Sequence, residues 1–143
     1  MVSDRRVMPR GGRRADDLPG RYPPVLIADG YEEARVPCAT YLNLLNFEVA
    51  EASIPTEAVA VIDAGWMPHV ILADPPCAQA LSERLASPAR VSSPPMIVMA
   101  TFSGTARPHK AVVLLKPFGL EEMVKTVRRV LRRSALISRG ESN

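Results

Sequence analysis

Three charged side chains, Asp29, Asp74 and Lys116, each stand directly after an apolar run of the sequence. Sheets of parallel strands bind ligands outside the carboxyl ends of their strands, so this placement predicts that the three groups meet at one rim. Two carboxylates can hold a hard divalent cation such as magnesium, which prefers oxygen ligands. Asp74 can then attack a phosphoryl group, while the metal and Lys116 neutralise the transferred oxygens. Thr101 ends a further apolar run, and its hydroxyl is placed to move toward new phosphoryl oxygens.

The elements that must position these groups alternate apolar runs with stretches of helical spacing. Strands are predicted at residues 25–28, 47–52, 70–73, 96–100 and 111–115. Helices are predicted at residues 32–45, 56–64 and 77–86, and from residue 120 to about residue 136. Strands that are apolar on both sides and are followed by helices predict a parallel sheet with both faces covered. The expected fold class is therefore α/β, a three-layer sandwich.

The connection between the last two predicted strands is short. Only residues 101–110 join them, whereas a parallel crossover normally needs a dozen or more residues and usually contains a helix. Gly104 and Pro108 oppose a helix further. We therefore expect the fourth helix to be shortened to a turn or missing.

Length and charge divide the chain into three parts. A chain of 143 residues, 47% of them hydrophobic, predicts a single domain. The net charge of +3 is uneven, because residues 1–21 and residues 117–143 each carry six basic and three acidic side chains, and the middle is acidic. Residues 1–22 have few large apolar side chains and predict a disordered basic arm. The domain is expected at residues 23–136, with a flexible tail at residues 137–143.

Composition excludes several classes of protein. Cys38 and Cys77 are too few and too far apart for a disulfide framework or a zinc site. The N-terminus lacks the apolar region of a secretory signal, and no apolar run approaches the ~20 residues that span a bilayer. We expect a cytoplasmic protein with no membrane partner.

From about residue 24 to residue 133, the chain resembles the receiver domain of two-component response regulators, the CheY-like family. The resemblance rests on VLIADGYEEAR, FEVAEAS, PHVILADPP, PPMIVMAT and VLLKPFGLEEMVKTVRRVL. The most specific piece is Lys-Pro-Phe at residues 116–118, which ends an apolar strand before the last helix. The resemblance implies a five-stranded parallel sheet in the flavodoxin-like order 2-1-3-4-5, and a cis peptide bond before Pro117.

The family's site residues carry over position by position. Asp74 matches the phosphoacceptor, Asp29 one acidic metal ligand and Lys116 the lysine of the site. The backbone carbonyl of Pro76 would be a further ligand of Mg²⁺, and Thr101 would be the switch hydroxyl. The resemblance thus implies a magnesium cofactor.

The chain departs from the family's pattern at several positions. Gly30 stands where receivers have a second acidic residue, so the magnesium site is weakened by one carboxylate. Ala100 aligns with the switch hydroxyl, and Thr101 comes one residue later, where a strand turns its side chain to the other face. For Asp74 an alternative remains, a helix N-cap with Pro75 at the first helical position.

The resemblance implies an atypical, single-domain receiver in phosphorelay signalling. A histidine kinase or phosphotransfer protein would donate a phosphoryl group to Asp74, and the phosphoprotein would signal to a downstream partner by protein–protein contact. The chain would not be an enzyme beyond self-catalysed aspartyl phosphorylation and dephosphorylation. The alternative is a pseudo-receiver, a protein-interaction module that works without phosphorylation.

The partners remain open in two respects. Nothing in the sequence decides whether the chain forms a homodimer. A nucleic-acid accessory role that uses both basic ends is a third hypothesis, although no helix-turn-helix motif follows the last helix, and we do not expect nucleic acid as a partner.

Overall fold

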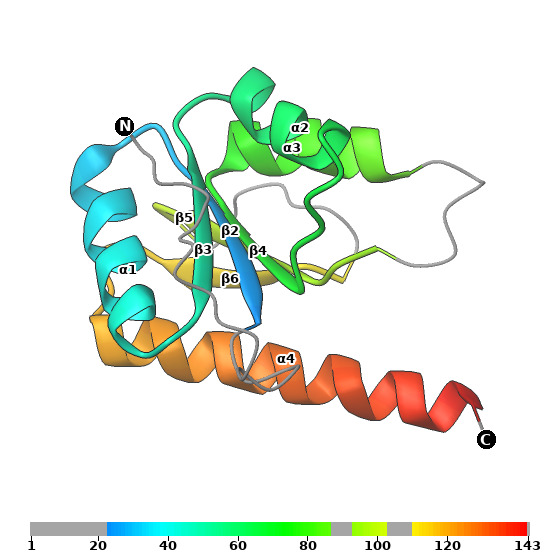
Figure 1. Ribbon diagram of the computed structural model, residues 1–143. Helices are drawn as coiled ribbons and strands as arrows, with labels where there is room; N and C mark the ends of the chain where they lie inside the picture. Colours follow the sequence, from blue (N-terminus) through cyan, green and yellow to red (C-terminus); the bar gives the residue numbers. More distant parts are fainter. Residues whose placement is uncertain (1–22, 87–92, 103–109, 143) are drawn as a thin grey trace.

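Strands and helices alternate over most of the described chain, and the last two strands follow each other (Figure 1). The computed structural model describes residues 23–86, 93–102 and 110–142, the last seven of these by their backbone alone. In chain order the elements are β2 (Pro24–Ala28), α1 (Glu32–Leu44), β3 (Glu48–Ala52), α2 (Pro55–Asp63), β4 (Val70–Ala73), α3 (Pro75–Leu85), β5 (Met96–Ala100), β6 (Val112–Leu115) and α4 (Leu120–Ser142). The arm predicted at residues 1–22 lies outside the described residues.

The strands form one parallel sheet in the order β3-β2-β4-β5-β6. Numbered along the chain, this is the order 2-1-3-4-5, so the predicted fold class is confirmed. Ala28 at the end of β2 pairs with Ala73 at the end of β4, and the backbone N–H of Asp74 donates to the Ala28 carbonyl at 2.8 Å. The register therefore brings Asp29 and Asp74, which follow these strands, to neighbouring places on one rim.

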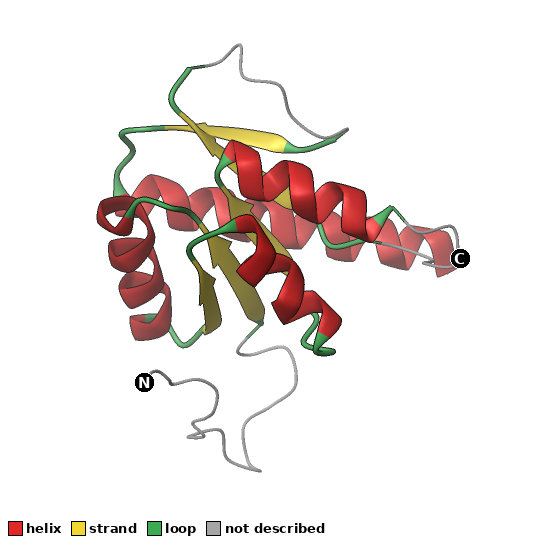
Figure 2. Cartoon of the chain, turned by 90° about the horizontal axis from the view of Figure 1, so that it is seen from above, coloured by secondary structure: helices red, strands yellow, loops and turns green. Residues whose placement is uncertain are grey.

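Helices cover both faces of the sheet (Figure 2). Successive side chains of a strand point to opposite faces. In β2, Val25 and Ile27 pack against α1 and α4, whereas Leu26 and Ala28 pack against α2 and α3. Every residue of β4 and β5 is buried, because helices lie on both sides of these strands. This burial explains the continuous apolar runs of the sequence.

Two helices, α3 and α4, differ from the predicted bounds by more than one residue at an end. α3 begins at Pro75, two residues early, because Asp74 caps the helix and a proline at the first helical position loses no hydrogen bond. α4 continues through Ser142, so the flexible tail predicted at residues 137–143 is wrong for residues 137–142. This segment has no proline, and the penalty of about 1 kcal/mol for one helical glycine, Gly140, is small beside the length of the helix.

The connection between β5 and β6 is described only at its ends. Residues 101–102 and 110–111 are not helical, and residues 103–109, on which the expectation of a missing helix mainly falls, lie outside the described residues. The Lys116–Pro117 bond that follows β6 is cis. None of the helices among the described residues is long and apolar enough to cross a membrane.

Candidate functional site

A buried ion pair lies at the carboxyl end of the sheet. Asp29 is fully buried, and its Oδ2 meets the Nζ atom of Lys116 at 2.7 Å. The other carboxylate oxygen, Oδ1, accepts a hydrogen bond from the backbone N–H of Tyr31 at 2.8 Å. The same Nζ lies 5.1 Å from the centroid of the Tyr31 ring, within the range of a cation–π contact. Asp29 therefore has a partner on each oxygen, and its counter-ion is the Lys116 ammonium.

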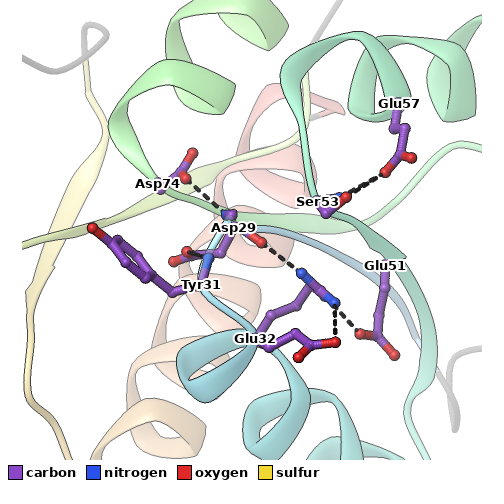
Figure 3. A network of polar contacts seen from close by, with 9 residues as sticks. Asp29, Tyr31, Glu32, Glu51, Ser53, Glu57 and Asp74 are labelled. Carbon is purple, nitrogen blue, oxygen red and sulfur yellow. Dashed lines mark hydrogen bonds and ion pairs between the residues drawn. The ribbon is translucent and has the colours of Figure 1, made fainter.

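Arg35 on α1 fixes the turn that carries Asp29. Its Nη1 donates to the backbone carbonyl of Asp29 at 2.9 Å, and its Nε donates to Glu51 on β3 at 3.0 Å (Figure 3). Glu32 lies 4.0 Å from the same guanidinium, with its side chain 80% exposed. Arg35 thus joins α1 and β3 to the turn after β2.

The Asp74 carboxylate is held by two backbone donors. Its Oδ1 accepts from the N–H of Cys77 at 3.0 Å and caps the N-terminus of α3. Its Oδ2 accepts from the N–H of Gly30 at 3.0 Å, the bond that reaches the turn of Asp29 in Figure 3. Asp74 is partly buried, and it joins the turn after β2 to the start of α3. The Asp74 side chain therefore forms the N-cap of α3, which is the alternative that the sequence left open.

Gly30 has room for a side chain at this point. A Cβ atom built on Gly30 would lie 3.4 Å from the carbonyl oxygen of Ser53 and 3.8 Å from Oδ2 of Asp74, both ordinary contact distances. The structure therefore has room for a Cβ atom at position 30. The side chain of an aspartate there would begin beside the Asp74 carboxylate. Gly30 thus removes a carboxylate from the rim, although the rim has room for the Cβ atom of a larger residue.

The predicted magnesium ligands are Asp29, Asp74 and the backbone carbonyl of Pro76. Pro76 lies inside α3, where helical carbonyls point toward the C-terminus of the helix, so the predicted carbonyl ligand is directed away from the rim. Asp29 and Asp74 have hydrogen-bond or ion-pair partners on all four carboxylate oxygens. Among the described residues, no group of three His, Cys, Asp or Glu side chains could hold a metal ion. The direction of the Pro76 carbonyl disagrees with its predicted role as a ligand, while magnesium binding by Asp29 and Asp74 stays a prediction.

Thr101 lies with Lys116 and away from Asp74. Ala100 is buried against α2 and α3, so the next residue along the strand turns to the face of α1 and α4. There Thr101 lines a groove of about 520 Å³ together with Tyr31, Glu33, Ala34, Pro37, Cys38, Lys116, Pro117, Phe118 and Leu120. Lys116 and Thr101 thus line one groove. Asp74, the predicted phosphoacceptor, is not among the residues that line it.

Both cysteines have thiols that resist ionisation. Burial, with the Asp29 charge as a second cause, raises the pKa of Cys38 to about 11. Burial, with a hydrogen bond to Asp74 as a second cause, raises the pKa of Cys77 to about 12. Reactive cysteines have lowered pKa values, so neither thiol is a nucleophile at neutral pH.

The raised thiol pKa values predict a loss of stability in alkali. The thiols ionise near pH 9.0 in the unfolded chain and at higher pH in the folded one. Their contribution is therefore complete below pH 9.0 and disappears as the pH rises toward 11 and 12. Each thiol should account for about 1 kcal/mol of the stability lost between about pH 8 and about pH 10. Urea unfolding at both pH values checks this, and Cys77→Ala should lose less than the wild type over the same interval. An equal loss would show that other groups cause it.

Sequence reasoning missed two residues of the rim. The ring of Tyr31 lies against the Lys116 ammonium, and Arg35 binds the backbone of the aspartate turn. Neither is marked by spacing, because their partners are a lysine far along the chain and a backbone carbonyl. The available signal for Tyr31 was its position two residues after a strand-end aspartate, where its own N–H can close a turn on that side chain.

The fold is that of response-regulator receiver domains. No protein-family model matches the sequence, and no curated protein matches it at a significant level. One similar solved structure is the N-terminal domain of a response regulator/sensory box/GGDEF 3-domain protein from Carboxydothermus hydrogenoformans, with 19% identity over 80% of this chain and 98% of that chain and a TM-score of 0.65. Another is the chemotaxis response regulator CheY4 of Vibrio cholerae, with 22% identity, 76% and 98% coverage and a TM-score of 0.65.

A third similar structure is the anti-anti-sigma factor PhyR from Bartonella quintana. It shares 19% identity over 84% of this chain with a TM-score of 0.68, and the match covers 51% of the PhyR chain. At these identities the likeness establishes the fold, while the chemistry of the rim must be argued from this chain's own residues.

Proposed function

We propose that this chain is a pseudo-receiver, a protein-interaction module with the receiver fold that signals without accepting a phosphoryl group. The observation that carries the proposal is the closed state of the rim. Backbone N–H groups hold both carboxylate oxygens of Asp74, and Lys116 and Tyr31 hold those of Asp29. No carboxylate oxygen at the rim is without a partner.

Charge at the rim supports the proposal. Aspartyl phosphorylation requires cations beside the oxygens of the incoming phosphoryl group. Of the two described cations at this rim, Lys116 is paired with Asp29 and Arg35 with Glu51. Gly30 supplies a backbone N–H where a carboxylate would help to bind a metal ion. Phosphoryl transfer to Asp74 would have to proceed beside a Lys116 that is paired with Asp29, and without a second carboxylate at position 30.

The second candidate is phosphorelay signalling, with a histidine kinase or phosphotransfer protein as donor. One observation favours it: Asp74 stands at the carboxyl end of β4 and is partly exposed, so a donor could reach it. On this reading the hydrogen bonds of Asp74 would rearrange when the donor binds. The two candidates differ in a single measurable event at Asp74.

Incubating the full chain with a saturating small phosphodonor, such as acetyl phosphate, and with magnesium should leave its intact mass unchanged. The reason is that the rim lacks the second carboxylate at position 30 and that Lys116 is paired with Asp29 rather than with Asp74. Intact mass spectrometry of the wild type measures the outcome, and a receiver domain that is labelled by the same donor serves as the positive control.

Two variants make this experiment decisive. A gain of one phosphoryl group by the wild type that is lost in Asp74→Asn would overturn the pseudo-receiver proposal and support phosphorelay. The variant Gly30→Asp adds the missing carboxylate at a position that tolerates a Cβ atom. Labelling of Gly30→Asp but not of the wild type would identify the lost carboxylate as the reason that Asp74 is inactive.

A further inference from the structure

One exposed face of α4 carries a row of cations, which we call the basic stripe: Lys125, Arg128, Arg129, Arg132 and Arg133, all exposed. The opposite face of the same helix is buried on the sheet through Met123, Val124, Val127 and Val130. The helix therefore has a fixed orientation, and the basic stripe faces solvent.

Carboxylates of the described chain do not neutralise the basic stripe. The ion pairs described for this chain involve Arg35, Arg84 and Lys116, all outside α4. Residues 123–140 contain six basic residues and no acidic residue. A typical solvated helix face mixes both signs of charge, so this long acid-free segment is unusual for a surface with no partner.

The spacing within the basic stripe also opposes the helix itself. Lys125 and Arg129, Arg128 and Arg132, and Arg129 and Arg133 are pairs of like charge four residues apart, and such pairs destabilise a helix. The helix dipole favours cations only in the last turn, and the stripe lies before the last turn of a helix that ends at Ser142. A bound anionic surface would remove this repulsion, which nothing else described in the chain does.

α4 extends to the end of the molecule at which the described chain begins. α4 starts at the carboxyl edge of the sheet and runs back past the opposite edge, beyond the strands (Figures 1 and 2). The chain enters β2 at that opposite edge, after residues 1–21 with six basic and three acidic side chains. The basic stripe therefore belongs to a chain whose middle segment is acidic and whose two terminal segments are basic.

The residue types of α4 favour an acidic protein over other polyanions. Residues 120–142 contain no aromatic residue, asparagine, glutamine or histidine, so α4 offers neither aromatic stacking nor amide contacts to nucleic-acid bases. A helix that binds a membrane surface inserts its apolar face, and the apolar face of α4 is occupied by the sheet. Guanidinium groups bind carboxylates through paired hydrogen bonds, and glutamates four residues apart on a helix match their spacing.

We infer that the basic stripe docks an acidic helix of a partner protein, with carboxylates repeating every four residues along one face. This inference rests on the proposed function, because it names the partner chemistry of an interaction module. Arg128 and Arg132 lie on successive turns of one side of α4, so each meets a carboxylate of an antiparallel or parallel helix laid along it. Association should weaken with added salt, since the contacts are exposed ion pairs.

Fluorescence anisotropy with the full chain tests the inference. The probe is a labelled, alanine-rich helical peptide with glutamates at i and i+4 along one face, and the comparison peptide has the same composition with its glutamates spread around the helix. The patterned peptide should bind more tightly than the comparison peptide, and Arg128→Glu should weaken its binding about tenfold. Lys110→Glu, which changes the charge equally at an exposed site outside α4, should leave binding within about twofold.

Folding and binding are separable in this design. Arg128→Glu places a glutamate four residues before Arg132, a favourable pair, so the unfolding temperature should stay the same or rise while binding falls. Equal binding of the two peptides, unchanged binding by Arg128→Glu, or tighter binding of a DNA duplex or of phosphatidylserine vesicles would each overturn the inference. None of these results bears on Asp74, whose mass measurement tests the proposed function independently.

Discussion

Replacing Lys116 with methionine should lower the free energy of unfolding by about 3–5 kcal/mol, the usual loss when one partner of a buried ion pair is removed. Asp29 is fully buried, and the partner of its Oδ2 among the described residues is the Lys116 ammonium at 2.7 Å, which is therefore its compensating charge. Methionine keeps much of the length and apolar volume of lysine, and the variant therefore tests the charge rather than the packing. Urea unfolding followed by circular dichroism measures the difference.

Two further variants separate the ion pair from a general effect of lysine removal. Lys110→Met removes an exposed lysine and should change the free energy of unfolding by less than about 0.5 kcal/mol. Adding Asp29→Asn to Lys116→Met removes the unpaired charge, while the amide oxygen can still accept from the Tyr31 N–H. This double variant should recover more than half of the lost stability. If Lys116→Met is as stable as the wild type, the pair is not the counter-charge that its geometry indicates.

Replacing Asp74 with alanine should lower the free energy of unfolding by about 2 kcal/mol. The loss has two parts of about 1 kcal/mol each: the N-cap of α3, and the acceptor of the Gly30 N–H. Both hydrogen bonds are structural. The variant therefore measures how much Asp74 stabilises the fold by linking the turn after β2 to the start of α3. Thermal and urea unfolding measure the effect.

Asp74→Ser is the matched control for the cap. A serine hydroxyl can accept from the Cys77 N–H but is too short to reach Gly30 as well, so about half of the stability should remain lost. Hydrogen exchange at the Gly30 amide should be faster in both variants, because its acceptor is gone in both. A stability equal to the wild type in Asp74→Ala would mean that the two bonds contribute little to folding, and would contradict the role of Asp74 as a structural link.

The strands were predictable because burial on both faces leaves a continuous apolar run. Residues 70–73 and 96–100 are strands with the predicted bounds, and every side chain in them is buried. The predicted helix began two residues after the true start of α3, whereas the alternative of an Asp74 N-cap with Pro75 at the first helical position gives the observed start. The end of α4 was placed too early because residues 137–142 have no apolar periodicity to indicate a helix.

The rim was predictable as a location and not as a set of contacts. The rule that places Asp29, Asp74 and Lys116 at strand ends depends on topology, which the sequence pattern specifies. Backbone N–H groups, an ammonium and a metal ion all compete for the oxygens of an aspartate. The spacing of residues in the sequence does not show which of these partners binds. Here Lys116 binds Asp29, and the backbone binds Asp74.

The order of the strands has a consequence for the sequence of events in folding. β2 is paired with β3 and β4, its next two strands along the chain, so this part of the sheet can assemble as soon as β4 has emerged from the ribosome. Lys116 comes much later, after β6, and α4 later still. Until then Asp29 lacks the Lys116 ammonium, and the face of the sheet that α1 and α4 cover lacks α4. The Asp29 carboxylate must therefore stay hydrated in the nascent chain. Closing the face and neutralising the aspartate are therefore late steps of synthesis, completed together by the last quarter of the polypeptide.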